Sequence, residues 1–293
     1  MNKVLIIGGD KRFIYLSRIL EDKGCEVKSF GTDGTGGGYD MASFEKDVRD
    51  ADMLILPIPY TTDGITVNTP LSDECLYLSK IYKNVRKDAL IFGGVVGDKY
   101  IPPDDVRFYD YAKREDFAYL NAVPTAEGAI EAVMKHIPIS ISGANVLVTG
   151  FGKCAKILSL TLKSLGAKVT VCARRSSDIA FAKSLGMNGV KISGMKNILG
   201  ASDVIFNTVP HIIFGDEELK CIKKGCPLAD IASYPGGAEK DAVKRYGTNY
   251  LFLPSLPGKY SPSTGAQIIL ETIKNISEEV GKEGILWNLS EKG

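Results

Sequence analysis

Short runs of apolar residues alternate with amphipathic segments along most of this 293-residue chain. The run KVLIIGG near the N-terminus predicts a buried strand, and the apolar spacing of three and four residues after it predicts a helix that ends at Gly24. Further strands are predicted at CEVKSFG, DMLILPIP, ALIFGGV and FAYLNAV. Strands that are apolar throughout and joined by helices are typical of a parallel sheet buried on both faces. The pattern therefore predicts an α/β fold.

The second half of the chain repeats this alternation at a regular spacing. Strands are predicted over residues 145–149, 168–172, 203–207, 227–232 and 250–253, with helices over 153–165, 178–185, 216–223 and 238–246. Such a succession of βαβ units predicts a second doubly wound parallel sheet of the Rossmann, dinucleotide-binding type.

A helix predicted to begin near Thr125, with Thr125 as its N-cap after Pro124, separates the two halves. We expect a final long helix after Pro262 to return to the first domain, as in many two-domain dehydrogenases. The predicted organisation is an N-terminal flavodoxin-like or Rossmann-like substrate-side domain (1–124), a hinge helix and linker (125–142), a dinucleotide-binding Rossmann domain (143–262) and a C-terminal helix (263–293).

Charge and cysteine content exclude several classes of function. The chain has 36 basic and 35 acidic residues, a balance that does not favour a nucleic-acid or membrane surface. Its six cysteines form no CxxC pair and no zinc spacing, so we expect reduced thiols and no metal site. No run approaches the roughly 18 apolar residues of a membrane-spanning helix, and the N-terminus lacks the pattern of a signal peptide. We therefore expect a cytoplasmic protein.

The motif GFGKCA predicts a dinucleotide site between a strand and a helix. Gly150 permits the tight turn, Gly152 leaves room for a pyrophosphate, and Ala155 lets the helix approach the strand closely. The helix N-terminus offers backbone N–H groups and a positive dipole end to the phosphates. The alternative is an ordinary tight turn of an α/β protein. The predicted contacts on this turn are Gly150, Phe151, Gly152, Lys153 and Cys154.

Arg174 and Arg175 follow the strand predicted over residues 168–172, at the place where an NAD site favours an acidic residue. A guanidinium binds a 2′-phosphate by charge-assisted hydrogen bonds, and the Ser176 hydroxyl adds a donor. Arg174 is the stronger candidate because it is nearer the strand end than Arg175. The sequence therefore favours NADP over NAD, although a solvated loop is the alternative interpretation of both arginines.

Two later strand ends are expected along the nicotinamide side of this site, because ligands bind at the carboxyl edge of such sheets. The predicted contacts there are Asn207, Thr208, Val209, Pro210 and Ser233. Asp230 lies inside a predicted strand, which favours a structural role. His211 follows this run and is a candidate acid/base, with a plain loop histidine as the alternative.

The first domain has its own glycine turn at Gly8 and Gly9, which lacks the GxGxxG spacing. Because it ends a strand and opens a helix, we expect it to bind an anionic substrate group, with Arg12 as a fixed cation or, alternatively, as a surface arginine. The predicted substrate-binding residues are Gly9, Asp10, Arg12, Thr61, Thr62, Thr125, Lys259 and Ser261. They are expected to face one crevice between the domains, although each alone is more often turn chemistry.

Seven motifs occur along the chain in a characteristic order: IIGGDKR, ILPIPYTTDG, AVPTAEGAI, VTGFGKCA, FNTVP, DIASYPGG and LPGKYSPSTGAQI. On these motifs the chain resembles the A subunit of bacterial dipicolinate synthase over nearly its full length. The last two motifs are the more specific ones. The resemblance implies NADP-linked formation of dipicolinate, a ring dicarboxylate, from a dihydro or hydroxytetrahydro precursor. It also implies that the partner is a flavoprotein-like B subunit, with the mother cell of a sporulating bacterium as the setting, and leaves a homodimer open.

Oxidation of such a ring requires close positioning against the nicotinamide more than a strong base. Glu127 is our first candidate for the proton acceptor, with a helix N-terminal charge as the alternative, and His211 is the second. Two other functions stay open. A 2-hydroxy-acid or amino-acid dehydrogenase would need a catalytic His with a carboxylate partner and an Arg, a set that we do not find. The chain would alternatively be a non-catalytic NADP-binding component of a two-protein synthase.

Overall fold

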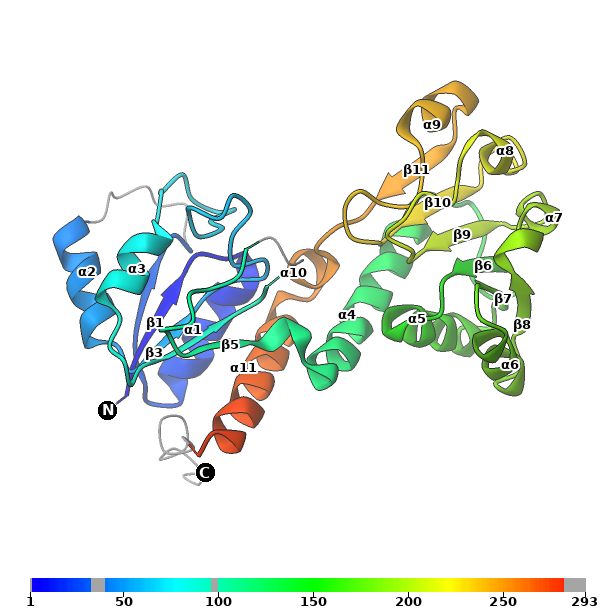
Figure 1. Ribbon diagram of the computed structural model, residues 1–293. Coiled ribbons are helices and arrows are strands. Elements are labelled where there is room, and N and C mark those ends of the chain that lie inside the picture. Colours follow the sequence, from blue (N-terminus) through cyan, green and yellow to red (C-terminus); the bar gives the residue numbers. More distant parts are fainter. Residues whose placement is uncertain (1, 33–39, 96–99, 282–293) are drawn as a thin grey trace. The chain divides into compact units, whose positions relative to one another are not determined.

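The computed structural model describes residues 2–32, 40–95 and 100–281 and consists of two compact units (Figure 1). The first unit contains Met1–Leu120 and Ser261–Gly293, and the second contains Asn121–Tyr260. Each unit is built on one sheet whose strands all pair in parallel, which confirms the predicted α/β fold with two parallel sheets. Within the described ranges, no helix is both long enough and apolar enough to cross a membrane.

The first unit has the five-stranded sheet order β2-β1-β3-β4-β5, which is a doubly wound order of the flavodoxin type. Its strands are β1 (Lys3–Ile7), β2 (Glu26–Phe30), β3 (Met53–Ile55), β4 (Leu90–Gly93) and β5 (Phe108–Asp110). Its helices are α1 (Lys11–Asp22), α2 (Met41–Asp50), α3 (Leu78–Asn84), the short 3-10 turn η1 (Tyr111–Lys113) and α11 (Pro262–Glu279).

Successive side chains of β1 enter two different cores, which explains why the strand is apolar throughout. Val4 and Ile6 pack with residues of α1 and α11, whereas Leu5 and Ile7 pack with residues of α2 and α3. Helix α11 therefore belongs to the core of the first unit, as predicted for a C-terminal helix that returns to it. The prediction extended this helix through residues 282–293, which lie outside the described residues.

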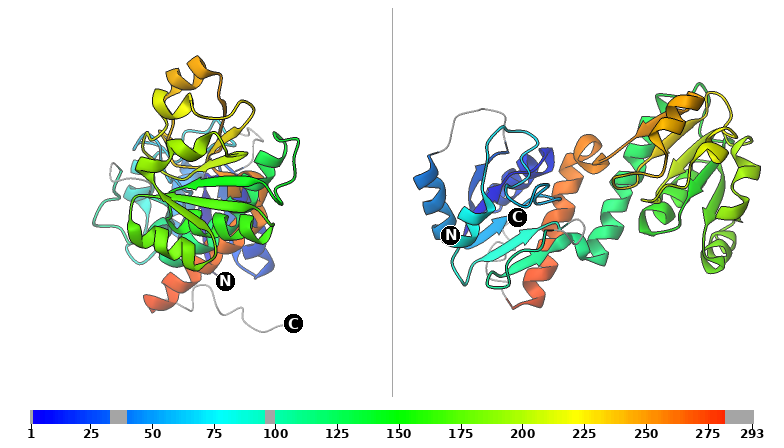
Figure 2. Two further views of the ribbon diagram at one scale, coloured as in Figure 1. Left: turned by 90° about the vertical axis from the view of Figure 1, so that its right-hand side faces the viewer. Right: turned by 45° about the horizontal axis from the view of Figure 1, so that its top comes forward.

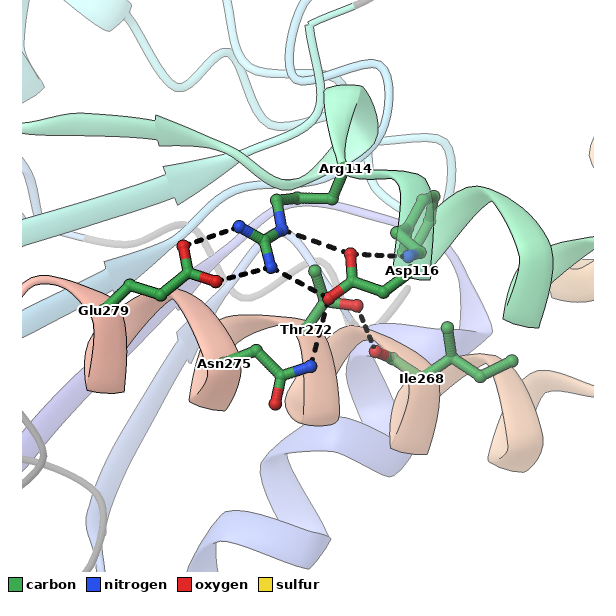
Figure 3. Close-up of polar contacts among 7 residues, drawn as sticks. Arg114, Asp116, Ile268, Thr272, Asn275 and Glu279 are labelled. Atoms are coloured by element: carbon green, nitrogen blue, oxygen red, sulfur yellow. Dashed lines mark hydrogen bonds and ion pairs between the residues drawn. The ribbon is translucent and has the colours of Figure 1, made fainter.

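Polar contacts join α11 to the segment that follows β5 (Figure 3). Arg114 donates to both carboxylate oxygens of Glu279 at 2.6 and 2.8 Å and to both of Asp116 at 3.1 Å. The Asn275 amide donates to Asp116 Oδ2 at 3.0 Å. The hydrogen bonds from Arg114 lower the pKa of Asp116 to about 2, so the network is ionised at neutral pH.

The second unit has the six-stranded sheet order β11-β10-β9-β6-β7-β8, which is the strand order of dinucleotide-binding domains. Its strands are β6 (Asn145–Thr149), β7 (Lys168–Ala173), β8 (Asn188–Lys191), β9 (Val204–Asn207), β10 (Pro227–Asp230) and β11 (Asn249–Phe252). Its helices are α5 (Lys153–Ser164), α6 (Ser176–Ser184), the 3-10 turn η2 (Ile192–Gly194), α7 (Lys196–Leu199), α8 (Asp216–Leu219), α9 (Lys240–Tyr246) and α10 (Leu256–Tyr260).

Helices cover both faces of this second sheet (Figure 2). Val146 and Val148 of β6 pack with residues of α5 and α6 and with the second half of α4 (Glu115–Met134), whereas Leu147 packs with residues of α7, α8 and α9. This alternation matches the pattern of the first sheet. The carboxyl ends of the strands are thereby left as the edge at which loops can form a site.

The predicted strand at FAYLNAV is wrong, because these residues lie in α4. Thr125 is not an N-cap: it lies inside this helix, and its hydroxyl donates to the Asn121 carbonyl oxygen at 2.6 Å. Pro124 is also inside the helix. The helix begins at Glu115 with two acidic residues, which interact favourably with the dipole of its first turn. A short apolar run fits a strand or a helix equally well, and here the run is part of a helix of 20 residues.

Candidate functional site

A cavity of about 660 Å³ opens at the carboxyl ends of β6, β7 and β9. The strand order reverses here, since β6 lies between β7 and β9, and such switch points are where open α/β sheets bind ligands. The volume is typical of a small-molecule site. The lining residues are Gly150, Phe151, Gly152, Lys153, Cys154, Ala155, Ala173, Arg174, Arg175, Asp178, Ile192, Thr208, Val209, Pro210, His211 and Ile213.

The glycine turn after β6 forms the floor of this cavity. Gly150 has φ +88°, and a Cβ there would overlap the Thr208 hydroxyl, so the turn requires glycine. Gly152 has φ −72°, and a Cβ there would meet no atom within 4 Å. A side chain at residue 152 would therefore project into the cavity and take up space that a ligand can use. This is the cradle that a dinucleotide pyrophosphate needs.

The N-terminus of α5 faces the same space. Gly152 is its N-cap, and no side chain caps the helix, so the backbone N–H groups of its first turn lack a side-chain acceptor. An anion is stabilised at such a helix end by these N–H groups and by the dipole. The residues present therefore fit the pyrophosphate of a nicotinamide dinucleotide.

Phe151, Cys154 and Ala155 complete the turn and the start of α5. Phe151 is 4% exposed, and its ring meets the Phe181 ring edge-on with centroids 6.1 Å apart. Burial raises the pKa of the Cys154 thiol to about 11, so the thiol is protonated at neutral pH. Ala155 is fully buried in the core between α5 and the sheet, which is the close approach that the motif predicts.

The two arginines after β7 differ in their contacts. The Arg175 guanidinium forms a two-pronged ion pair with Asp178, with N–O distances of 2.8 and 3.0 Å. The Arg174 side chain is exposed and has no hydrogen bond or ion pair within the described part of the chain, although its backbone carbonyl accepts from Lys191. Ser176 begins α6 and does not line the cavity. Of these two arginines, Arg174 is therefore the one whose charge is not paired with a carboxylate at the end of β7.

Asn207 at the end of β9 is turned into the protein and is fully buried. Its amide nitrogen donates to Asp230 Oδ1 at 2.8 Å and to the Val209 carbonyl oxygen at 3.0 Å. Its amide oxygen accepts from the Thr149 hydroxyl at 2.6 Å and from the Val209 backbone N–H at 3.1 Å. The protein thus satisfies all four hydrogen-bonding positions of the amide. These hydrogen bonds leave the Asn207 amide no free donor for the predicted cofactor contact.

The other residues predicted along this edge have different surroundings. The Thr208 hydroxyl donates to the Thr149 carbonyl oxygen at 2.8 Å, while Val209, Pro210 and His211 line the cavity. Ser233 is exposed, does not line the cavity, and accepts a backbone hydrogen bond from Gly236 in a turn. Glu127 is exposed in the middle of α4, so neither the cavity nor a helix N-terminus includes it.

The glycine turn of the first unit is closed by its own side chains. The Asp10 carboxylate caps α1 by accepting from the Arg12 backbone N–H at 3.0 Å. It also holds the Arg12 guanidinium by two hydrogen bonds of 2.9 Å. Arg12 is 5% exposed, so the alternative of a surface arginine is wrong, while its contact with a substrate group stays a prediction. A Cβ at Gly9 would overlap the Phe13 ring, which explains this glycine by packing.

The remaining residues predicted to bind a substrate fall into two groups. Thr61 is buried and belongs to a turn, where its hydroxyl accepts from the Gly64 N–H and donates to Asp63. Backbone hydrogen bonds from the same turn hold the pKa of Asp63 well below its usual value. Thr62, Lys259 and Ser261 have no side-chain hydrogen bond or ion pair with any described residue.

Four lining residues were not predicted: Ala173, Asp178, Ile192 and Ile213. Asp178 has a local signal, because it follows Arg175 by three residues and so pairs with it on the first turn of α6. The two isoleucines follow β8 and β9 in loops without a motif. Within the described residues, no group of three or more His, Cys, Asp or Glu side chains could hold a metal ion.

Comparisons with known proteins agree with the motifs. Residues 3–101 match the family model of the N-terminal domain of the dipicolinate synthase A subunit. The chain is 27% identical over 289 residues to the A subunit of dipicolinate synthase from Bacillus subtilis (strain 168), which covers 96% of this chain and 97% of that relative. The crystal structure of the A subunit from Bacillus halodurans is 28% identical with a TM-score of 0.81, covering 94% of this chain and 97% of that one. The predicted resemblance is confirmed.

More distant solved structures share the fold alone. D-2-hydroxyisocaproate dehydrogenase is 13% identical with a TM-score of 0.56, covering 96% of this chain and 97% of that chain. The chain therefore shares the fold of this dehydrogenase, and its second unit has the strand order of a Rossmann unit.

Proposed function

We propose that this chain is the NADP-binding dehydrogenase component of a dipicolinate synthase, and that it oxidises a dihydrodipicolinate or hydroxytetrahydrodipicolinate precursor. The observation that carries the proposal is the cavity of the second unit. There, Gly152 leaves space before an uncapped helix N-terminus, and Arg174 stands uncommitted at the neighbouring strand end. The similarity to the A subunit of Bacillus subtilis dipicolinate synthase over 96% of the chain supports the assignment to dipicolinate synthesis.

Each part of the cavity has a proposed role in binding the cofactor. The turn from Gly150 to Cys154 would hold the pyrophosphate through the first N–H groups of α5. Arg174 would bind the 2′-phosphate, and this makes NADP the proposed cofactor. The loop after β9 would lie along the nicotinamide, which supplies the hydride acceptor.

The proposed reaction balances without a further oxidant. Dihydrodipicolinate loses a hydride to NADP⁺ and a proton, giving dipicolinate and NADPH; the hydroxytetrahydro precursor loses one water as well. His211 lines the cavity and is our candidate to take the proton. Glu127 does not line the cavity and is the second candidate. Of the predicted substrate residues in the second unit, Lys259 keeps an uncommitted cation for a carboxylate.

A partner protein is part of the proposal. The relatives are named as A subunits, which supports a B subunit that we expect to be flavoprotein-like. The setting would then be the mother cell during sporulation. A non-catalytic NADP-binding role, with the chemistry performed by that partner, remains the alternative that the experiment must separate.

The test uses the purified chain with NADP and enzymatically generated dihydrodipicolinate, with and without the partner protein. We expect the absorbance of NADPH and of the pyridine product to rise together with the chain alone, and to be absent with Gly152→Asp. Product formation by the chain alone would exclude the non-catalytic role, whereas product formation only with the partner would leave both roles open. Absence of NADP binding to the chain would refute the proposal, and oxidation of a 2-hydroxy acid instead would replace it.

A further inference from the structure

The loop that lines the β9 side of the cavity is held at both ends by hydrogen bonds that lead to one buried carboxylate, that of Asp230. We define the cavity loop as residues 208–213, which contribute five lining residues. We propose that Asp230 is a positioning residue that fixes the cavity loop in the shape that binds the nicotinamide half of the cofactor. This inference rests on the proposed function, because it assigns a role within that same cavity.

The first end of the loop is held through Asn207. Asp230 Oδ1 accepts from the Asn207 amide nitrogen at 2.8 Å, and the same nitrogen donates to the Val209 carbonyl oxygen at 3.0 Å. The amide oxygen of Asn207 accepts from the Val209 N–H at 3.1 Å. The Asn207 side chain, which Asp230 orients, therefore forms hydrogen bonds with both the N–H and the carbonyl of Val209.

The second end is held through Gly237. Asp230 Oδ2 accepts from the Gly237 N–H at 2.6 Å. The Gly237 carbonyl oxygen accepts from the N–H groups of Ile213 and Phe214 at 2.9 and 3.0 Å. The two carboxylate oxygens of Asp230 thus lead to opposite ends of the cavity loop.

Gly236 and Gly237, which end the motif DIASYPGG, fit this arrangement. A Cβ at Gly237 would overlap the Asn207 amide, and a Cβ at Gly236 would lie 2.8 Å from Asp230 Oδ2. The turn must therefore consist of glycine to pack directly on the pair of Asp230 and Asn207. The motif DIASYPGG, which is one of the specific motifs of the sequence, has a physical reason in this contact.

Asp230 acts only as an acceptor. It is fully buried, and it accepts from Asn207, Gly237, the Ala232 N–H at 3.1 Å and the Tyr250 hydroxyl at 2.8 Å. No Lys or Arg forms an ion pair with it in the part of the chain that the structure describes. Burying a carboxylate without a cation carries a large desolvation penalty, and an apolar residue would occupy a strand end without that penalty. Four convergent donors instead fix its geometry.

The cavity loop and Arg174 lie at different ends of the site. Arg174 follows β7 and the cavity loop follows β9, with β6 between these two strands. A dinucleotide that crosses the turn after β6 has its adenosine on one side and its nicotinamide on the other. A defect in the cavity loop should therefore weaken only ligands that carry the nicotinamide half.

The experiment measures the affinity of the full chain for NADPH and for adenosine 2′,5′-bisphosphate by calorimetry. Asp230→Asn presents an amide N–H₂ to donors, so at least one anchor breaks. We expect the dissociation constant of NADPH to rise by roughly tenfold or more, and that of the bisphosphate to stay within a factor of about two. The matched control is Asp203→Asn, which also removes a hydrogen-bonded carboxylate of the second unit but lies before β9. It should change neither constant.

A second variant covers the case in which Asp230→Asn does not fold. Thr149→Val is close to isosteric and removes only the hydroxyl that orients Asn207, so it should give the same selective loss to a smaller degree. Equal weakening of both ligands, or no weakening in either variant, overturns the positioning role and makes Asp230 purely structural. If the unaltered chain binds neither ligand, the proposed function itself fails, and that result is distinct from the first.

Discussion

The two units begin with the same local plan, a parallel strand, a glycine turn and a helix, but the residue that caps the helix differs between them. In the first unit the N-cap of α1 is Asp10, and in the second the N-cap of α5 is Gly152. Asp10 caps its helix and holds the buried Arg12 guanidinium. Gly152 has no side chain and borders a cavity of about 660 Å³.

The comparison teaches that the N-cap residue, more than the number of glycines, separates a structural turn from a ligand-binding one. A helix N-terminus attracts an anion through its N–H groups and its dipole. Asp10 supplies that anion from within the chain and pairs with the Arg12 guanidinium. At α5 the same attraction is left for a phosphate.

Exchanging the N-cap type should have the largest effect. Gly152→Asp would give α5 the cap that α1 has, and the backbone accepts it because φ is −72° and no atom lies near the new Cβ. We expect detectable NADPH binding to be lost, since the carboxylate repels the pyrophosphate and takes its N–H donors. The melting temperature should hold or rise. Gly152→Ala, which adds a methyl without charge, should weaken binding less; strong NADPH binding by the Asp variant would contradict the comparison.

The reverse change at the first turn should cost stability. Asp10→Ala leaves α1 uncapped and the buried Arg12 guanidinium unpaired, so we expect the free energy of unfolding to fall by about 3 kcal/mol. Urea denaturation measures this. Asp40→Ala is the matched control, because Asp40 caps α2 at an exposed site without a buried arginine, and its loss should be nearer ~1 kcal/mol. Equal losses would show that the buried pair adds nothing.

Much of the second unit could be predicted because its strands are buried on both faces and bounded by glycine or proline. The strand predicted at 145–149 is β6, and the helix predicted at 153–165 is α5 to within one residue. The cavity was predictable for the same reason: a GxGxxA motif has one interpretation when a strand precedes it and a helix follows.

The role of a site residue could not be predicted where it depends on its hydrogen-bond partners. Such a partner is either distant in the sequence or a neighbour whose pairing geometry the sequence does not show. The side chain of Asn207 ends a strand, but whether it faces a ligand or the core depends on Asp230, which is 23 residues away. Arg12 is a cation at a helix start, and only its two-pronged geometry with Asp10 shows that it is engaged. The edge strand β8 (Asn188–Lys191) was missed, because its residues are exposed or half-buried and its sequence NGVK has no apolar run.

The charge next to the open turn should have a smaller effect than the turn itself. Arg174→Ala should raise the dissociation constant of NADP by roughly tenfold to a hundredfold and leave that of NAD unchanged. Arg175→Ala is the matched variant, and we expect less change because this guanidinium is paired with Asp178. Isothermal titration of both cofactors measures the ratio. An NADP to NAD ratio that stays the same in the Arg174 variant would refute the 2′-phosphate assignment.

The smallest effect concerns the second residue of each helix, which is Arg12 in α1 and Cys154 in α5. Burial raises the pKa of Cys154 to about 11, so the thiolate is about one part in a thousand at pH 8 and increases tenfold per pH unit below that pKa. We expect slow alkylation by iodoacetamide that accelerates with pH, and further protection by NADPH because Cys154 lines the cavity. Mass spectrometry of the Cys154 peptide follows the rate, with the exposed Cys75 as the faster internal reference. If both thiols react equally fast at neutral pH, burial does not hold the Cys154 thiol protonated. If NADPH leaves the Cys154 rate unchanged, the uncapped end of α5 is not the place where the dinucleotide binds.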